Sequence, residues 1–144
     1  MQKLMLILIA MLIPLVGSTA ETNDEAIMDR KAAFEELKEA VADTKKAMKA
    51  DDFAAAKLSA GNILTNAMAV TKLFPEGSYE GDTRAKKKIW EKRDDFNERQ
   101  QKLVSDAEML YAATDSNDPK QLKTAFKTLA KNCKGCHMRY RQLF

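Results

Sequence analysis

Histidine, cysteine, proline and glycine are all scarce in this chain. Its 144 residues include one histidine, two cysteines, three prolines and five glycines. So few turn-forming residues leave few places to break the chain, which favours a small number of long helical pieces. A closed zinc site needs four protein ligands, and one histidine with two cysteines can reach that number only if a carboxylate joins them.

Long apolar runs are also rare, and the one that exists lies at the N-terminus. Lys3 precedes an apolar run over residues 4–16, and small residues follow up to Ala20. This order is typical of a secretory signal peptide, and the run is shorter than the ~20 residues that span a bilayer as a helix. We therefore predict a signal peptide over residues 1–20, cleaved after Ala20. The remaining residues, 21–144, are expected to form one domain that does not insert into a membrane.

Neither sign of charge dominates the composition. The chain has 24 lysines and arginines against 21 acidic residues, a formal net charge of +3. The two signs are interspersed, which describes a solvated surface rather than a nucleic-acid footprint. The one local run, Lys86-Lys87-Lys88, is interpreted as an exposed helix face. We therefore expect no nucleic-acid partner.

Turn and cap signals divide the chain after residue 20 into four pieces. A capping box over residues 22–25 opens the first piece, and the aspartates at 51–52 can cap the second. A loop over residues 75–82 precedes the third piece, which the pattern extends over 83–113. An aspartate and a proline at 118–119 open the fourth.

Within each piece, apolar residues recur at alternating steps of three and four, which predicts one inward face for each helix. The predicted inward residues are Ile27, Phe34, Leu37, Val41 and Met48, with Arg30 and Thr44 at the same face; Phe53, Ala56, Ala60, Ile63, Ala67, Val70 and Phe74; Ile89, Phe96, Leu103, Ala107 and Leu110; and Leu122, Phe126, Leu129, Cys133, Cys136, Tyr140 and Leu143. Met68 and Met109 are expected to fill gaps in the core. The fold class is therefore predicted as all-α, an up-down-up-down antiparallel four-helix bundle. A long coiled coil is the alternative, disfavoured by the regular breaks.

Both cysteines and the histidine fall in one short segment, Cys-Lys-Gly-Cys-His over residues 133–137. On a helix, Cys133 and Cys136 take inward positions, and His137 lies one turn after Cys133 on the same face. A zinc site built on these three residues would lack a fourth ligand from histidine or cysteine. A thioredoxin-like dithiol would need a preceding strand and a helix N-terminus, whereas this pair lies near a helix C-terminus. A local disulfide is compatible with export but leaves His137 unexplained.

Attachment of a c-type haem uses all three residues, and Cys-x-x-Cys-His is its signature. Two thiols one helical turn apart can each add to a vinyl group, and the adjacent histidine can bind the iron. We therefore predict one covalently attached haem c, with thioethers at Cys133 and Cys136 and His137 as the axial iron ligand.

With this motif near the end of a helical chain, the sequence resembles the cytochromes c′, the class II c-type cytochromes. The resemblance covers essentially all of residues 21–144. It is carried by CKGCHMRYR in the fourth piece and by FPEGSYEGDTRAKKKIWEKRDDF over residues 74–96. It implies an exported, periplasmic four-helix-bundle haem protein, which would not be an enzyme and would have no catalytic residue.

The resemblance also implies roles for residues around the haem. Arg141 matches a basic residue near the proximal imidazole, although a cation at a helix C-terminus is also favoured by the helix dipole. Trp90 resembles a buried tryptophan near the haem, and packing alone explains it equally well. Arg30 matches the basic residue one turn before the distal face. Lys31 departs from the glutamine that many relatives carry at its position.

Phe34, one turn after Arg30, matches the position that faces the sixth coordination site in this family. Phenylalanine cannot ligate iron, no second histidine exists, and Met28 is expected on another side of the helix. The resemblance then implies five-coordinate, high-spin iron that is redox-active and binds NO and CO. The alternative is a low-spin electron carrier for periplasmic redox proteins, and a third class is a haem-free helical interaction module. Relatives are often dimers through their first two helices, and the alanine-rich second piece would permit a homodimer.

Overall fold

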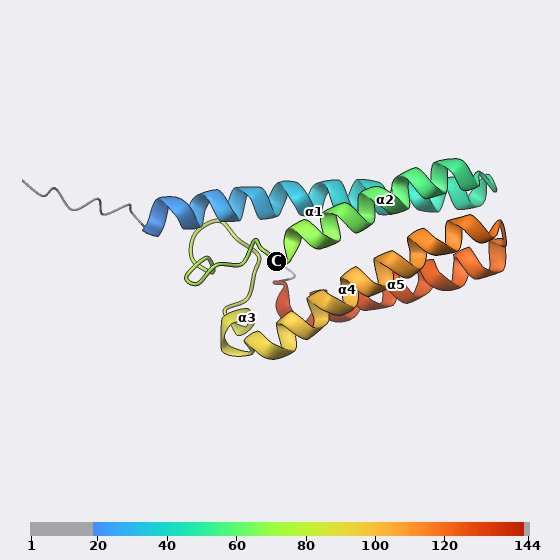
Figure 1. Ribbon diagram of the computed structural model, residues 1–144. Helices are drawn as coiled ribbons and strands as arrows, with labels where there is room; N and C mark the ends of the chain where they lie inside the picture. The colour runs from blue at the N-terminus through green and yellow to red at the C-terminus, as the bar shows by residue number, and fades with distance from the viewer. Residues whose placement is uncertain (1–18, 143–144) are drawn as a thin grey trace, which may run out of the picture.

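The computed structural model describes residues 19–142, which form an antiparallel bundle of four long helices (Figure 1). The helices are α1 (Thr19–Lys49), α2 (Phe53–Val70), α3 (Lys88–Glu91), α4 (Arg93–Ala113) and α5 (Pro119–Tyr140), with a 3-10 turn, η1 (Thr114–Ser116), before α5. α1 and α2 form one pair, α4 and α5 form a second, and the pairs meet along α2 and α4. α1 and α5 hardly touch. The predicted fold class is confirmed.

The predicted caps of the second and fourth helices are confirmed. Asp52 precedes α2, and its Oδ1 accepts a hydrogen bond from the Ala55 amide at 2.9 Å. Asp118 precedes α5, and its Oδ1 accepts from the Lys120 amide at 2.9 Å, with Pro119 at the first helical position. These side chains satisfy amides that have no partner within the helix.

Two predicted helix starts are wrong. α1 begins at Thr19 rather than at residue 22, so the predicted cleavage position after Ala20 falls in its first turn; the signal peptide up to residue 18 lies outside the described residues. The third helix does not begin at residue 83. The backbone there pairs instead with the end of α5, with the Lys86 amide 2.9 Å from the Tyr140 carbonyl oxygen and the Gln142 amide 2.8 Å from the Arg84 carbonyl oxygen.

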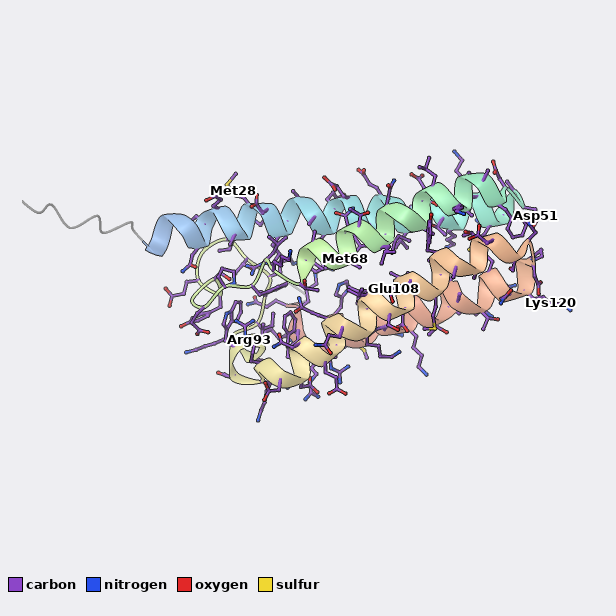
Figure 2. All side chains as sticks on the ribbon, in the orientation of Figure 1. Met28, Asp51, Met68, Arg93, Glu108 and Lys120 are labelled. Carbon is purple, nitrogen blue, oxygen red and sulfur yellow. The ribbon has the colours of Figure 1, made fainter. Side chains whose placement is uncertain are left out.

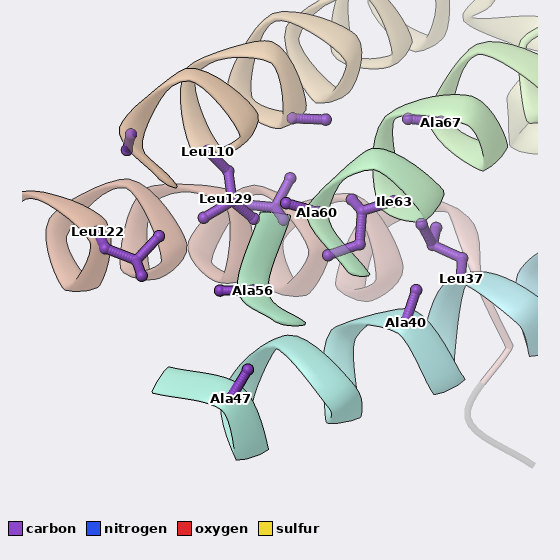
Figure 3. Close-up of a cluster of buried hydrophobic side chains, with 12 residues drawn as sticks. Leu37, Ala40, Ala47, Ala56, Ala60, Ile63, Ala67, Leu110, Leu122 and Leu129 are labelled. Carbon is purple, nitrogen blue, oxygen red and sulfur yellow. The ribbon is translucent and has the colours of Figure 1, made fainter. Parts of the chain in front are cut away.

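The core of the bundle forms where α2 approaches its neighbours closely (Figure 3). The described residues that the heptads place inward are buried or half-buried, Arg30 and Thr44 included, while Leu143 lies outside the described residues. Small side chains on α2 allow the close approach, and Ile63, Leu110 and Leu129 fill the space between the helices. Met68 and Met109 are 55% and 49% exposed, so their predicted core role is wrong: both lie on outward faces.

Tyr140 fastens the end of α5 to α4. Its side chain is buried, and its hydroxyl donates a hydrogen bond to Asp95 Oδ2. The same oxygen lies 3.0 Å from Arg99 Nε and 3.0 Å from Arg139 Nε. The hydrogen bond from Tyr140, followed by that from Arg99, lowers the pKa of the Asp95 carboxyl. Because Tyr140 is the last residue of α5, this contact fixes the turn that carries His137.

Truncation of Leu129 tests the core. Leu129 is 1% exposed, and we expect Leu129→Ala to lower the free energy of unfolding by about 2–5 kcal/mol, because it removes buried methyl groups and leaves a cavity. Leu58 is 72% exposed, and Leu58→Ala should change it by less than about 0.5 kcal/mol. Denaturant unfolding of both variants measures the difference; equal losses would contradict the assigned core.

The Asp95 contact predicts an acid-dependent stability. The pKa of the Asp95 carboxyl is lowered in the folded state. Its contribution to the free energy of unfolding is therefore fully present above the unfolded-state pKa of about 3.9, and it is lost as the pH falls through the folded-state pKa. Asp95→Asn should therefore lower Tm near neutral pH, and the difference from the unsubstituted protein should shrink toward pH 3. Melting curves across this range measure it, with Asp43→Asn, at an exposed site, as the control. A Tm difference for Asp95→Asn that does not change with pH would contradict the assignment.

Candidate functional site

The two helix pairs splay apart at one end of the bundle (Figure 1). Two adjoining cavities are lined by residues of this end. Their volumes are about 250 Å³ and about 340 Å³. Both are lined by Phe34, Lys38, Phe74, Phe96, Cys136 and His137. The first continues into the bundle past Leu103 and Cys133, whereas the second opens toward Arg30 and Arg141.

A contact between Phe34 and His137 lies where the two cavities adjoin. The Phe34 ring, from α1, meets the His137 ring, from α5, edge to face, with centroids 6.3 Å apart and an interplanar angle of 65°. Both side chains line both cavities. The two spaces are therefore parts of one region between α1 and α5, and these rings belong to the wall of both.

Cys133 and Cys136 are free thiols on the side of α5 that faces this region. Both are half-buried, and burial raises the pKa of each thiol, so both are protonated near neutral pH. Within residues 19–142, no group of three or more His, Cys, Asp or Glu side chains is placed to enclose a metal ion. The arrangement therefore favours neither a zinc thiolate site nor a reactive dithiol.

The imidazole of His137 is poised as a neutral ligand. Burial lowers its pKa, and the positive charge of Arg141 lowers it further. The ring is then uncharged at neutral pH, which is the form that can bind a metal ion. Arg141 itself is exposed at the edge of the second cavity, and its backbone forms an isolated β-bridge with Ala85.

Arg30 is a buried cation whose guanidinium organises the loop over residues 71–87. Its nitrogens donate to the Leu73 carbonyl at 3.1 Å, to the Ser78 carbonyl at 2.9 Å and to Thr83 Oγ1 at 2.8 Å. Burial lowers its pKa to about 10, so it remains charged at neutral pH. These acceptors are neutral oxygens, and the charge lies at the second cavity. Sequence reasoning placed Arg30 in the pocket but missed this loop-building role; its signal was an arginine at an apolar heptad position.

Trp90 supports the same loop and lines neither cavity. Its indole N–H donates to the Pro75 carbonyl at 2.8 Å, and its half-buried ring packs against Phe74 and Tyr79 at centroid distances of 6.2 and 5.2 Å. Phe74 separates it from the cavities, because the Phe74 ring lines both of them. Trp90 therefore acts on this region through Phe74.

Met28 and Lys31 take no part in the contact between Phe34 and His137. The Met28 side chain is 69% exposed and lines neither cavity (Figure 2). Lys31 lies at the edge of the second cavity and pairs with Asp82 at 2.5 Å.

Asn132 was not singled out from the sequence. It lines the first cavity, and its buried Nδ2 has no hydrogen-bond partner among the described residues.

The residues present fit a covalently held haem. Two free thiols and a neutral imidazole project from one helix face toward apolar walls. The second cavity is also lined by the cationic side chains of Arg30, Lys31 and Arg141, which could form ion pairs with the carboxylates of such a group. A macrocycle that is apolar over most of its area and acidic at one edge matches both parts of this region.

Comparisons with known proteins agree with this fit. The Cytochrome C′ family model matches residues 25–141. Cytochrome c-556 from Agrobacterium fabrum is 40% identical over 102 residues, which cover 71% of this chain and 68% of the relative. Cytochrome c′ from Rhodopseudomonas palustris is 31% identical over 143 residues, covering 96% of this chain and 97% of the relative.

A solved structure gives the same result for the fold. Cytochrome c prime from Shewanella frigidimarina superimposes with a TM-score of 0.79 at 32% identity, covering 83% of this chain and 96% of the other. The matched residues include the whole Cys-x-x-Cys-His segment. The chain belongs to the cytochrome c′ family, and its cofactor is a covalently attached haem c.

Proposed function

We propose that this protein is a five-coordinate, high-spin haem protein, with His137 as the axial ligand, that is redox-active and binds NO and CO. The observation that carries the proposal is the Phe34 ring packed against His137, 6.3 Å between centroids. Phenylalanine offers no atom that can bind iron. The side chain opposite the proposed ligand would therefore occupy space without coordinating.

The other cavity-lining residues support an open sixth position. Among the described residues that line the two cavities there is no methionine and no second histidine. Met28 and Met138 are 69% and 62% exposed, so neither sulfur is directed into this region. The low-spin electron carrier, which needs a sixth ligand, is therefore the less supported alternative.

Each protein group has a distinct part in this proposal. Cys133 and Cys136 would hold the haem through thioethers, and His137 would bind the iron as a neutral base near the cation of Arg141. Phe34 keeps water and larger ligands away from the opposite face. When bound, haem supplies reversible one-electron chemistry and a vacant position for diatomic gases. Phe34 itself offers no hydrogen-bond donor, so it would not stabilise bound O₂.

A solved structure that is similar to this chain supports the proposed binding of nitric oxide. A variant of cytochrome c prime from Alcaligenes xylosoxidans, 25% identical with a TM-score of 0.76 over 83% of this chain and 96% of the other, was solved as a nitric oxide complex. By analogy, we propose NO sequestration or detoxification as the role of this chain. Redox partner proteins would return the iron to its starting oxidation state.

The place of action is proposed as the periplasm, after removal of residues 1–20. The N-terminal pattern supports export, and the alignment with the Rhodopseudomonas palustris relative extends over 96% of this chain. In the described part of the chain, no helix is long and apolar enough to cross a membrane. A homodimer stays a prediction: Leu58, 72% exposed on α2, would be covered in such a pair.

Substitution of Phe34 tests the proposal directly. Phe34→Met places a thioether opposite His137, and we expect the haem spectrum to move toward a low-spin, six-coordinate form. Phe34→Leu is the matched control, because it keeps the side chain apolar and should leave the iron five-coordinate. Absorption and resonance Raman spectra of the matured variants measure the spin state. A low-spin spectrum in the unsubstituted protein would overturn the proposal.

The two cysteines provide a second test. Cys133→Ser with Cys136→Ser should yield protein whose haem is removed by denaturation and extraction, because both thioethers are lost. The unsubstituted protein should keep its haem through the same treatment, and each single variant should keep it through one bond. Extractable haem in the unsubstituted protein would contradict the roles of Cys133 and Cys136.

A further inference from the structure

The outward face of α5 carries a stripe of five lysines. Their spacing of three and four residues places them on one side of the helix, and all five are exposed. We call this set the α5 basic stripe: Lys120, Lys123, Lys127, Lys131 and Lys134. Figure 2 shows Lys120 at the end of the bundle near Asp51, so the stripe runs from there toward the haem motif.

No acidic side chain balances this stripe. Residues 119–142 contain no aspartate or glutamate, and within the described part of the chain none of the five lysines joins an ion pair. Other helices do pair their cations with acids, namely Lys38 with Glu35, Lys57 with Asp115 and Lys102 with Asp106. The charges on this surface are therefore segregated, although the composition as a whole is mixed.

The stability of α5 does not account for this pattern. Like charges three and four residues apart on a helix repel each other. Lys120 also lies in the first turn, where the helix dipole disfavours a cation. A sequence selected only for a stable helix would mix acids into this face, as α1 and α4 do.

The stripe ends at the haem motif, on a bare patch of the helix. Lys134 and Gly135 lie between the two cysteines, and a Cβ placed on Gly135 would meet no atom within 4 Å beyond its chain neighbours and the backbone of its own helix. Met138, one turn later, is 62% exposed. Lys86 borders this patch, with its Nζ 3.3 Å from the Met138 carbonyl oxygen. A partner can therefore come close to the backbone between Cys133 and Cys136.

We propose that the α5 basic stripe docks an acidic electron-transfer protein and brings its redox centre to the patch at Gly135 and Met138. In such a complex one electron would pass from the partner, which is oxidised, to the haem, which is reduced, with no proton transferred and no covalent bond formed or broken. This inference rests on the proposed redox function. A membrane surface fits less well, because Thr124 and Thr128 between the lysines are polar and Met138 is the one exposed large apolar side chain among the described residues of α5, which leaves little apolar surface to insert.

The occupant is inferred from charge complementarity. Segregated charge of one sign steers association with an oppositely charged partner, and this effect weakens as salt screens it. The exposed Met138 supplies a small apolar contact at the centre of the patch, while lysines border it, which resembles the core and rim of a transient interface. Single-stranded nucleic acid is bound by cations together with aromatic side chains that stack on the bases, and the stripe carries no aromatic side chain.

Stopped-flow reduction of the matured protein by reduced flavodoxin, used as an acidic one-electron donor, tests the proposal. We expect the second-order rate constant to fall as salt rises. The variant Lys127→Glu, Lys131→Glu, Lys134→Glu should lower it at least tenfold at low salt. The matched control, Lys45→Glu, Lys46→Glu, Lys49→Glu, makes the same change in net charge at the far end of α1 and should change the rate constant less than twofold.

The same proteins are also reduced by a neutral hydroquinone, whose rate should not differ among them. Equal slowing of both triple variants by flavodoxin, or no dependence on salt, would overturn the docking surface. Stripe-dependent binding to phosphatidylglycerol vesicles with unchanged flavodoxin rates would overturn it in favour of a membrane. Failure of the unsubstituted protein to accept electrons from the hydroquinone would instead contradict the redox function. Circular dichroism verifies that each variant is folded.

Discussion

The separation of α1 from α5 is the constraint on which the site depends. Small side chains at the inward positions of α2 let this helix approach both α1 and α4, so those helices close into a packed core. No such close packing joins α1 to α5. At one end the gap is lined by large rings, among them Phe34, Phe74 and Phe96, which keep the pairs apart. The bundle thus forms a core along most of its length and a cavity at one end.

Two polar contacts keep that end in shape. The guanidinium of Arg30 gathers three segments of the loop over residues 71–87, and its burial is offset by hydrogen bonds and by the Phe74 ring, 4.6 Å from the guanidinium carbon. Tyr140 and Asp95 fix the last turn of α5 against α4. These contacts between residues of the chain itself hold the helix that carries the thiols and the loop that borders the cavity. Such preorganisation reduces the entropy that binding must overcome.

Much of this structure follows from local sequence rules. The heptads of apolar residues predicted four helices and their inward faces, and Asp52 and Asp118 predicted two of the starts. The part that failed was non-local. Residues 84–86 leave the helical pattern because the chain end at 140–142 offers backbone hydrogen bonds, and nothing near residue 84 in the sequence signals that partner. The place of Trp90 near the haem stays a prediction; in the fold, Phe74 lies between the Trp90 ring and the cavities.

The site was predictable in kind because its chemistry is concentrated in five consecutive residues. Cys133, Cys136 and His137 needed only helical geometry to be placed on one face. The identity of the opposing residue came from resemblance, and the fold brings Phe34 and His137 into contact from helices that are otherwise apart. The segregation of lysines on α5 was hidden by the even overall composition, because charge patterning becomes visible only when the faces of the helix are known.

The central claim is that the haem occupies the region where the rings of Phe34 and His137 now meet. A crystal structure of the matured protein tests it most directly. The account predicts that the edge-to-face contact between these rings, 6.3 Å between centroids, is replaced by a haem lying between the two side chains and bonded to Cys133 and Cys136. A structure in which Phe34 still packs on His137, with the haem bound elsewhere, would contradict it.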